Sequence, residues 1–489
     1  MGATIYEGNQ PGACNCEFSH AYPYAIGPRF GFAYKLDAKT VVRGGWGVTY
    51  AQTQGGQSTN QSTLGAGGWN TLSFSNPTYG APASLLQNGM NYNLSSLYNA
   101  TLNPGIRPQP GQIQSPPAYL DPNAGRMPRM NQWDISLQRQ ITTNLTLETS
   151  YVGNRGVWFE ANSLDNLNAI SQQRLASFGL SLNSATDRTL LTSALNSPAV
   201  VAAGFKAPYA GFPVTSTLAQ ALRPYAQFST ITVVGAALGN TWYDSLQAKL
   251  TKRFSHGLDL LTTFVWQKEL DTLEGANNVF NRSVNKDISS LSQPFELTIA
   301  YNYQLPAVGK NAVLRQVIGG WTLGGILAYS SGVPVPVPTA QNNLSADVFQ
   351  STYANRVPGV PLFLKNLNCH CINPYSDLVL NPAAWTQPAA GQFGTAAEFY
   401  NDYRYERRPN ESMSVGRIFK IRENMTFQLR AEFFNVFNRT YLNNPTATNS
   451  IASTTNNAQG QLTSGFGYIN PGSVQNNPRN GQIVARFRF

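Results

Sequence analysis

Apolar and polar positions alternate along much of the chain, and the pattern is clear in residues 481–489. Side chains of an extended strand point to opposite faces with a period of two. One face would carry Ile483, Ala485, Phe487 and Phe489. The other would carry Gln482, Val484, Arg486 and Arg488. An apolar face ending in aromatic rings is typical of a barrel strand in a bilayer, with the rings at headgroup level. An edge strand of a soluble sandwich is the alternative.

The same alternation predicts ten further strands, arranged as five hairpins. Short connections join the strands of each pair, and residues such as Asp37-Ala38 and Ser255-His256-Gly257 suit tight turns. The predicted strands cover residues 29–36, 39–50, 131–140, 145–153, 241–254, 258–270, 294–305, 320–332, 411–421, 424–437 and 481–489.

Long polar connections separate the hairpins. Several structureless loops of this length are rare in compact soluble domains, whereas outer-membrane barrels have short periplasmic turns and long outer loops. We therefore predict an all-β fold, an antiparallel up-and-down transmembrane β-barrel with about eleven strands in this chain. A soluble all-β repeat is the alternative. Residues 1–28 would form an outer loop segment and 29–489 the barrel part, with long outer loops near 52–128, 156–240, 270–292, 333–410 and 438–480.

Two loop segments carry local signals. Residues 167–195 have weak helical periodicity, and the prolines of residues 333–338, VPVPVP, predict that strand pairing stops there.

Composition agrees with strands in a membrane. Charged residues make up only 12% of the 489 residues, and aromatic residues 11%. No window approaches the roughly 18 apolar residues of a membrane-spanning helix. The net charge is +10, but lysines and arginines are spread singly, so nucleic acid is not an expected partner.

The first residues contain no basic region followed by an apolar core, as a secretory signal would. If Phe489 lies on the periplasmic side, counting back through eleven strands puts the beginning of the sequence in an outer loop. We therefore expect that a signal and further strands precede this sequence.

Several segments, taken in their order and spacing, resemble the carboxy-terminal barrel half of TonB-dependent receptors. The most similar group is the Oar-like receptors, which carry an amino-terminal carboxypeptidase-regulatory-like domain. The segments are PRFGFAYKL, TVVRGGWGVTY, PRMNQWDISLQRQI, LETSYVGNRG, WYDSLQAKLTKRFSHGL, GGWTLGGILAYSSGVP and LRAEFFNVFN.

The resemblance implies a Gram-negative outer-membrane receptor for TonB-energised uptake of an unknown extracellular ligand, such as a glycan or another large nutrient. It implies a barrel of about 22 strands, of which this chain supplies the carboxy-terminal half. Its expected partners are outer-membrane lipid, the barrel-assembly machinery and, through an amino-terminal part, the TonB complex. A passive porin or adhesin-like barrel and a secreted soluble glycan-binding β-protein remain the alternatives. The resemblance also implies that the aromatic residues Phe487 and Phe489 act as an assembly signal.

The polar strand faces supply candidate lumen residues rather than catalytic ones. No nucleophile-elbow, phosphate-loop or HExxH motif occurs, so we expect neither an enzyme nor a cofactor. Arg404 to Pro409 favour a charged rim, and loop aromatics such as Trp69, Trp158, Tyr209, Trp385 and Tyr403 favour girdle or loop packing over ligand stacking. The expected lumen-facing residues are Asp134, Glu148, Gln247, Lys249, Glu296, Gln428, Arg430, Glu432, Arg486 and Arg488.

The four cysteines form two C-x-C pairs, Cys14/Cys16 and Cys369/Cys371, in predicted outer loops. An oxidising compartment favours disulfides. Free thiols are one alternative. Zinc binding by the four thiolates is the weaker one, because C-x-C is tighter than the usual ligand spacing. The pattern leaves the disulfide connectivity open.

Overall fold

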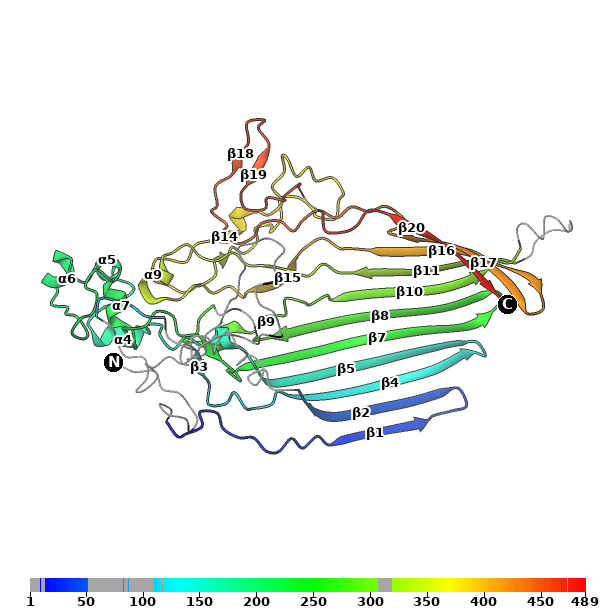
Figure 1. The fold of residues 1–489 in the computed structure, drawn as a ribbon, viewed down its shortest axis with the longest axis horizontal. Helices are drawn as coiled ribbons and strands as arrows, with labels where there is room; N and C mark the ends of the chain where they lie inside the picture. Colours follow the sequence, from blue (N-terminus) through cyan, green and yellow to red (C-terminus); the bar gives the residue numbers. More distant parts are fainter. Residues whose placement is uncertain are drawn as a thin grey trace.

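The computed structural model describes residues 9, 14–51, 82, 87, 110–115, 118–273, 275, 277–306, 319–472 and 474–489. Its main feature is one large antiparallel sheet, in which every strand of the main path pairs with its neighbours along the chain (Figure 1). This confirms the predicted all-β antiparallel fold and its strands. The path runs through β1 (Arg29–Lys35), β2 (Thr40–Tyr50), β4 (Arg129–Thr142), β5 (Leu145–Phe159), β7 (Gly239–Ser255), β8 (Leu258–Asp271), β10 (Phe295–Gln304), β11 (Trp321–Ser330), β16 (Asn410–Arg422), β17 (Met425–Phe434) and β20 (Asn480–Arg488). The short β9 (Asp287–Ile288) pairs with β8 outside this path.

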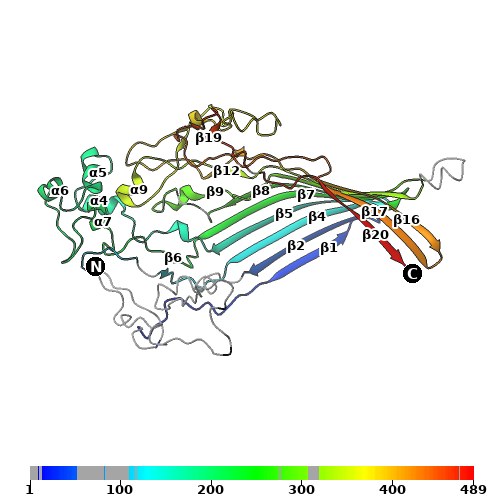
Figure 2. The same cartoon turned by 45° about the horizontal axis from the view of Figure 1, so that its top comes forward.

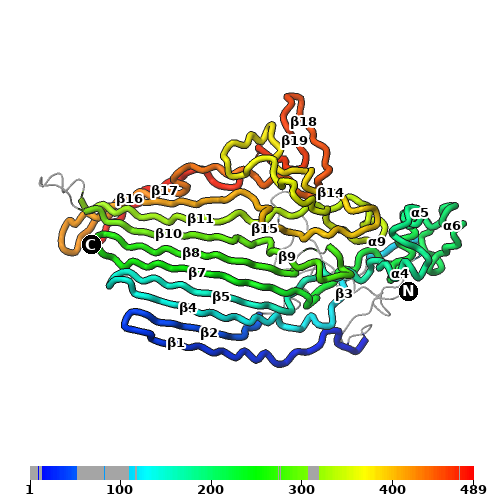
Figure 3. The backbone as a smooth tube through the Cα atoms, turned by 180° about the vertical axis from the view of Figure 1, so that it is seen from behind, coloured from blue at the N-terminus to red at the C-terminus, as the bar shows by residue number. Residues whose placement is uncertain are grey.

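The two ends of the sheet differ. Short turns gather at one end, where the chain also ends, and the long connections gather at the other (Figures 1 and 3). Local chemistry fixes the turns. Asp37 accepts hydrogen bonds from the Lys39 amide at 2.6 Å and the Thr40 hydroxyl at 3.0 Å. His256 and Gly257 both have positive φ, 53° and 80°, as a two-residue hairpin turn requires.

The sheet is curved but open (Figure 2). Within the described residues, β1 pairs only with β2, and β20 pairs only with β17. The two edge strands lie on opposite sides of the sheet (Figure 1). Both edges therefore carry backbone groups with no ladder partner among the described strands.

One face of the sheet is apolar. Cross-strand partners in an antiparallel ladder have side chains on the same face. One such row runs across five strands through Ile135, Tyr151, Leu246, Trp266 and Phe295. All five side chains are exposed, which is the reverse of a soluble domain's core. The apolar face would therefore be unfavourable in water and favourable in lipid.

Charged residues bound this apolar face along the strands. On β7, Asp244 lies at the loop end and Lys252 at the turn end, with apolar Leu246 and Leu250 between them. The stretch from Asp244 to Lys252 measures roughly 26 Å along the strand at about 3.3 Å per residue. At a tilt of about 40° this stretch rises roughly 20 Å, which is most of the ~25 Å height of the apolar band of an outer-membrane barrel.

The connection between β5 and β7 folds into a helical unit with its own apolar core. Leu191, Val200 and Leu218 are fully buried in it. Leu344 and Val348, from the connection between β11 and β16, complete the same core. The weak helicity expected over residues 167–195 corresponds to the two helices at 172–177 and 185–192, which belong to a packed structure rather than to a structureless loop. The helices are η2 (Asn162–Leu164), α4 (Gln172–Ser177), α5 (Ala185–Thr192), α6 (Pro198–Ala202), α7 (Leu218–Leu222) and α9 (Leu344–Val348).

A second loop core joins the last two long connections. Val335, Leu380 and Tyr403 from one connection pack with Phe466 and Ile469 from the other. Small ladders and 3-10 helices support the loops: β3 (Tyr119–Leu120) with β6 (Val233–Val234), β12 (Pro334–Pro336) with β15 (Phe399–Arg404), β13 (Asn355–Arg356) with β14 (Trp385–Thr386), β18 (Thr455–Asn456) with β19 (Leu462–Ser464), η3 (Arg282–Asn285) and η4 (Pro382–Ala384).

The expectation that the prolines of residues 333–338 prevent strand pairing is wrong. Pro334 and Pro336 pair with Arg404 and Phe399 across an irregular two-stranded ladder. Proline can occupy an edge strand, because its missing N–H then faces away from the partner. None of the helices that the structure describes is long and apolar enough to cross a membrane.

Candidate functional site

The ladder register places all ten expected lumen residues on one face of the sheet, opposite the apolar face. Glu148, for example, pairs with Gln138 on β4 and with Lys249 on β7. Gln428 pairs with Arg486 on β20. The residues on this polar face are Asp134, Glu148, Gln247, Lys249, Glu296, Gln428, Arg430, Glu432, Arg486 and Arg488.

A polar row crosses this face from the turn end of β8 to the loop end of β17. Asp259, Asn302, Gly324, Ser414 and Glu432 are successive cross-strand partners from β8 to β17. A Cβ at Gly324 would lie only 2.9 Å from the Ser414 Oγ, so the glycine leaves the row open at its centre. A cavity of about 500 Å³ lies against this part of the sheet, and Asp259, Asn302 and Glu432 help to line it. The row offers oxygen and amide groups for hydrogen bonding.

A basic group lies beside this row, on β17 and β20. Arg430, Arg486 and Arg488 line a cavity of about 280 Å³ together with Gln428. Arg430 also forms an ion pair with Glu432. Guanidinium groups bind carboxylates and phosphates in a fixed fork geometry. This edge of the polar face can therefore hold an anionic group.

A buried polar network holds together the helical unit, which lies at the loop end of the sheet. The Asn168 side chain donates to the carbonyl oxygens of Phe228 at 3.0 Å and Ser229 at 2.7 Å. The Arg223 Nε donates to the Asn168 carbonyl at 2.9 Å, and its guanidinium lies 3.6 Å from the Phe349 ring. Burial lowers the pKa of Arg223 to about 10, so the side chain still carries its charge at neutral pH. The network joins two long connections into one body.

Asn277 joins the loops in a similar way. Its amide donates to the carbonyl oxygens of Gly394 at 2.8 Å and Ala396 at 3.0 Å. Its oxygen accepts from the Thr352 hydroxyl at 2.5 Å and the Tyr353 amide at 3.0 Å. This buried side chain therefore holds the connection after β8 against the connection after β11.

Asp287 is a loop carboxyl whose pKa lies well above its ordinary range. Its carboxylate accepts from the backbone amides of Glu398 at 2.6 Å and Phe399 at 3.3 Å. Burial, helped by the negative charges of the nearby Glu398 and Asp271, nevertheless raises the pKa of Asp287 to about 7, although the two amides act to lower it. These contacts hold the backbone of residues 398–399 against β9, so we assign Asp287 a structural role.

The predicted loop aromatics lie mostly in packed environments. Tyr209 packs edge-on against Phe212 in the helical unit. Trp385 and Tyr403 contact each other in the second loop core, with ring centroids 5.4 Å apart. Trp158 lies under Arg126 and Arg129, and Trp69 lies outside the described residues.

The expected arginine rim also ties loops together. Arg404 donates to the Gly332 carbonyl at 3.1 Å, and Arg408 donates to the Asn444 side chain at 2.6 Å. The Arg407 backbone amide donates to the Asn368 side-chain oxygen at 2.9 Å. These contacts use the arginines to fix neighbouring loops.

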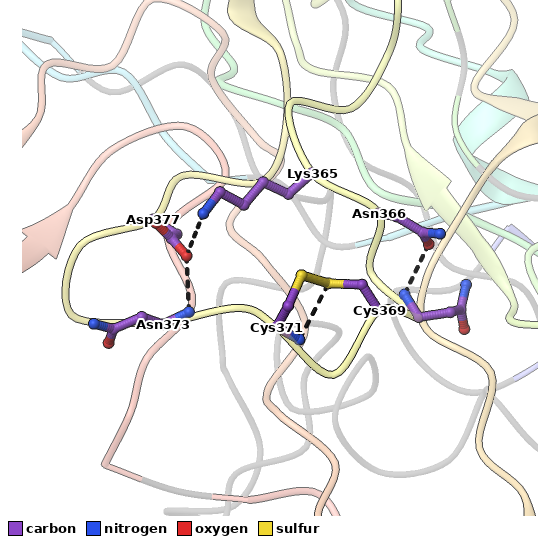
Figure 4. The surroundings of a disulfide bond; sticks show 7 residues. Lys365, Asn366, Cys369, Cys371, Asn373 and Asp377 are labelled. Carbon is purple, nitrogen blue, oxygen red and sulfur yellow. Dashed lines mark hydrogen bonds and ion pairs between the residues drawn. A yellow bond between two sulfur atoms is a disulfide. The ribbon is translucent and has the colours of Figure 1, made fainter.

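The four cysteines are joined within each C-x-C pair, Cys14 to Cys16 and Cys369 to Cys371. Figure 4 shows the second bond beside the Lys365–Asp377 ion pair, whose charged atoms are 2.7 Å apart. In this connectivity neither disulfide staples one loop to another. In the described part of the chain, no group of three or more histidine, cysteine or acidic side chains could hold a metal ion.

The two proposed assembly residues belong to an aromatic row at the turn end of the apolar face. Phe487 pairs with Phe427, which stacks on Phe419 at a centroid distance of 6.1 Å. The Phe489 ring lies 6.2 Å from that of Phe487 and is almost fully exposed. The row lies where an aromatic girdle would meet the membrane interface.

Sequence reasoning missed the packed loop bodies and the single residues that hold them. Asn168, Arg223, Asn277 and Asp287 lie in stretches without strand alternation, and their partners are distant in sequence. Composition alone gave no signal for them.

The structure matches several solved outer-membrane proteins over 95% of this chain. They include the outer membrane transporter YddB from Escherichia coli (10% identity, 41% of that chain, TM-score 0.38). They also include the ferripyoverdine receptor of Pseudomonas aeruginosa (10%, 33%, 0.36) and the ferric citrate transporter FecA (9%, 38%, 0.36). The chain thus spans about a third to two fifths of the chains that it matches.

No curated protein matches the sequence. A family model does match it, that of the outer membrane beta barrel domain, over residues 3–482. This match covers almost the whole chain and agrees with a sheet of alternating strands that is apolar on one face and polar on the other. The chain therefore belongs to the outer membrane β-barrel domain family and is an outer-membrane protein of a Gram-negative bacterium.

Proposed function

We propose that this chain forms part of the wall of a TonB-energised receptor that takes up a ligand across the outer membrane. The observation that carries the proposal is the division of the sheet into an apolar face and a polar face with hydrogen-bonding rows. In this proposal the apolar face contacts lipid and the polar face, with its ten candidate residues, lines the lumen. The packed loop bodies contact the ligand outside the cell.

The open edges of the sheet support a larger barrel. Backbone N–H and C=O groups cannot face lipid without partners, so β1 and β20 need neighbouring strands in the membrane. If these eleven strands make up about half of the wall, the barrel has about 22 strands. A lumen of that width is plugged in known transporters, and we propose the same here.

The resemblance to Oar-like receptors supports the finer assignment. It adds an amino-terminal regulatory-like domain, a plug and a segment that binds the TonB complex. In this proposal the strand part begins at residue 29, and residues 1–28 belong to an outer loop. The ligand is a glycan or another large nutrient, because a wide lumen suits a bulky compound.

A passive porin or adhesin-like barrel is the second candidate, since such a barrel would have the same two faces. A secreted soluble protein is not compatible with membership of the outer-membrane family. We propose no catalytic role, because the acidic residues of the polar face are spread over several strands rather than paired in a dry pocket.

The test compares energised uptake with passive conductance. A strain lacking the gene and a wild-type strain treated with a protonophore should leave the same compounds unconsumed in a complex glycan medium. In planar bilayers with potassium chloride as the probe, the purified full-length protein should remain closed. Steady ion conductance together with uptake that survives the protonophore would favour the porin and contradict the proposal.

A further inference from the structure

The apolar face carries three basic residues where it meets the loops, Arg155, Lys268 and Lys286. Directly above the apolar row that contains Leu246 and Trp266, Asp244 pairs with Lys268 across β7 and β8. One row further, Arg155 pairs with Trp242. Asp244, Trp242 and Lys268 share the face of Leu246 and Trp266, because they lie two or four residues from them on the same strands. Arg155 shares this face as the ladder partner of Trp242. These residues therefore lie at the boundary between the lipid band and the loops.

Two lysines in this group have no acidic partner in the described chain. Lys286, just before β9, lies 3.6 Å from the centre of the Trp242 ring. Lys268 and Lys286 are both exposed, and no described carboxylate lies within ion-pair distance of either. Asp244, the ladder partner of Lys268, is already engaged by Arg155 at 2.9 Å and by the Tyr151 hydroxyl at 2.5 Å. The group therefore has a net positive charge.

An apolar cavity adjoins the lysines. Its volume is about 660 Å³, and Lys268 and Lys286 lie on its lining beside Leu246, Trp266, Leu270 and Phe295. Ladder register puts these four apolar side chains on the same outward face. Asp287 also borders the cavity. It is the ladder partner of Asp271, however, and so belongs to the opposite, polar face. A long apolar chain with a negative group at one end fits this combination.

We propose that Lys268 and Lys286 bind the phosphate of a phosphorylated, acylated glycolipid of the outer leaflet, one acyl chain of which occupies the adjoining cavity. The proposal rests on the assignment of the apolar face to lipid. The occupant is a membrane lipid rather than a free anion, because the lysines border an apolar groove on that face. The orientation agrees with it, since long loops of such barrels lie on the outer side.

The full-length protein is extracted from outer membranes and incubated with an added lipid. Native mass spectrometry then measures how much of that lipid the protein retains. The probes are bisphosphorylated lipid A and dephosphorylated lipid A, added in detergent. The double variant Lys268→Gln/Lys286→Gln should retain the phosphorylated lipid about 30-fold less well, since each basic side chain near an anionic surface contributes a factor of about five. Dephosphorylated lipid A should be retained poorly by the wild type as well.

Two control variants separate charge from folding. Lys252→Gln removes the same charge at the turn end of β7 and should leave retention unchanged. Lys268→Arg/Lys286→Arg keeps both charges and should retain the lipid within about twofold, so it also shows whether side-chain replacement alone disturbs the site. Added inorganic phosphate should not compete at millimolar concentration if the acyl chain is part of the bound ligand.

Equal retention by the wild type and the double glutamine variant would overturn the proposal, as would equal retention of the two lipids. These outcomes leave the proposed uptake function intact, because membrane partitioning and ligand uptake would be unaffected. A wild-type protein that fails to partition into the membrane would instead refute the lipid-face assignment and the site together.

Discussion

Replacing Leu297 by arginine tests which face of the sheet meets lipid. Leu297 lies on the apolar face of β10 and pairs with Phe264 and Tyr329. Phe264 is roughly 13 Å along β8 from Lys268, at about 3.3 Å per residue, so this row lies well inside the apolar band. The neighbouring Thr298 points to the polar face, where it pairs with Thr263 and Ala328.

The expected cost of Leu297→Arg follows from its depth. A basic side chain near the bilayer midplane costs about 2–4 kcal/mol on the lipid face of a barrel and about 0–1 kcal/mol near an interface. At about 1.4 kcal/mol per factor of ten, the larger range lowers the folding equilibrium constant roughly 30- to 700-fold. Thr298→Arg should cost less than about 1 kcal/mol, because the polar face holds other charged groups and water.

The assay is a urea titration of the full-length protein in phosphatidylcholine vesicles, followed by the heat-dependent shift in gel mobility. Thr298→Arg is the matched control, since it adds the same side chain one residue away. Equal destabilisation by the two variants would refute the division of faces. A larger effect at Thr298 would mean that the faces are reversed.

Three further predictions concern the aromatic row, a loop carboxyl and a disulfide. Phe489→Ala should lower the amount of receptor that reaches the outer membrane while Arg488→Ala does so much less, and equal amounts on outer-membrane blots would contradict the assembly role. Burial holds the pKa of Asp287 at about 7, above the ~3.9 of an unfolded Asp, so the folded chain binds more protons between about pH 4 and pH 7 and stability falls as pH rises through that window. Asp287→Asn should flatten this pH dependence, measured as hydrogen-exchange protection of residues 398–399 corrected for the intrinsic rate, and an unchanged slope would assign it to another group. Cys369→Ser should cost only about 1.5 kcal/mol of loop stability, because the bond closes a three-residue loop, and should leave barrel assembly unchanged; a tryptic peptide joining Cys369 to Cys14 would contradict the local pairing.

The strands were predictable because their physical determinant is local. A period of two is visible in any segment that has one lipid-facing and one polar side, such as residues 294–305, and β10 covers Phe295–Gln304. Tight turns follow from residues that favour unusual backbone angles, as His256 and Gly257 do. A strand one residue out of register would exchange the two faces, so alternation also determines the pairing.

The loops were not predictable because their determinants are distant. The core around Leu191 and Leu218 is completed by Leu344, which belongs to another connection. Helices of five to eight residues are too short for a clear helical period, and α5 is the longest of them in the described chain. The ladder that contains the prolines depends on pairing between Pro334 and Arg404. Arg404 lies far along the chain, so no local pattern indicates this pairing.

The candidate site was likewise predictable only in part. Alternation identified the ten residues that share the polar face, but it could not show which of them meet. The basic group of Arg430, Arg486 and Arg488 depends on the register between β17 and β20. The cavity beside Lys268 and Lys286 depends on β9, a two-residue strand without any alternation of its own.

The most direct test of the account is the accessibility of spin labels placed one at a time along β10, from residue 295 to residue 303, in the receptor reconstituted in a bilayer. Labels at odd-numbered positions should collide with oxygen, which is concentrated in the lipid. Labels at even-numbered positions should collide with a water-soluble nickel chelate or be shielded from both reagents. A period-two alternation with oxygen maxima at residues 295, 297, 299, 301 and 303 is the predicted result. Loss of that alternation, or oxygen maxima at the even-numbered positions, would contradict the claim that the apolar face of this sheet meets lipid.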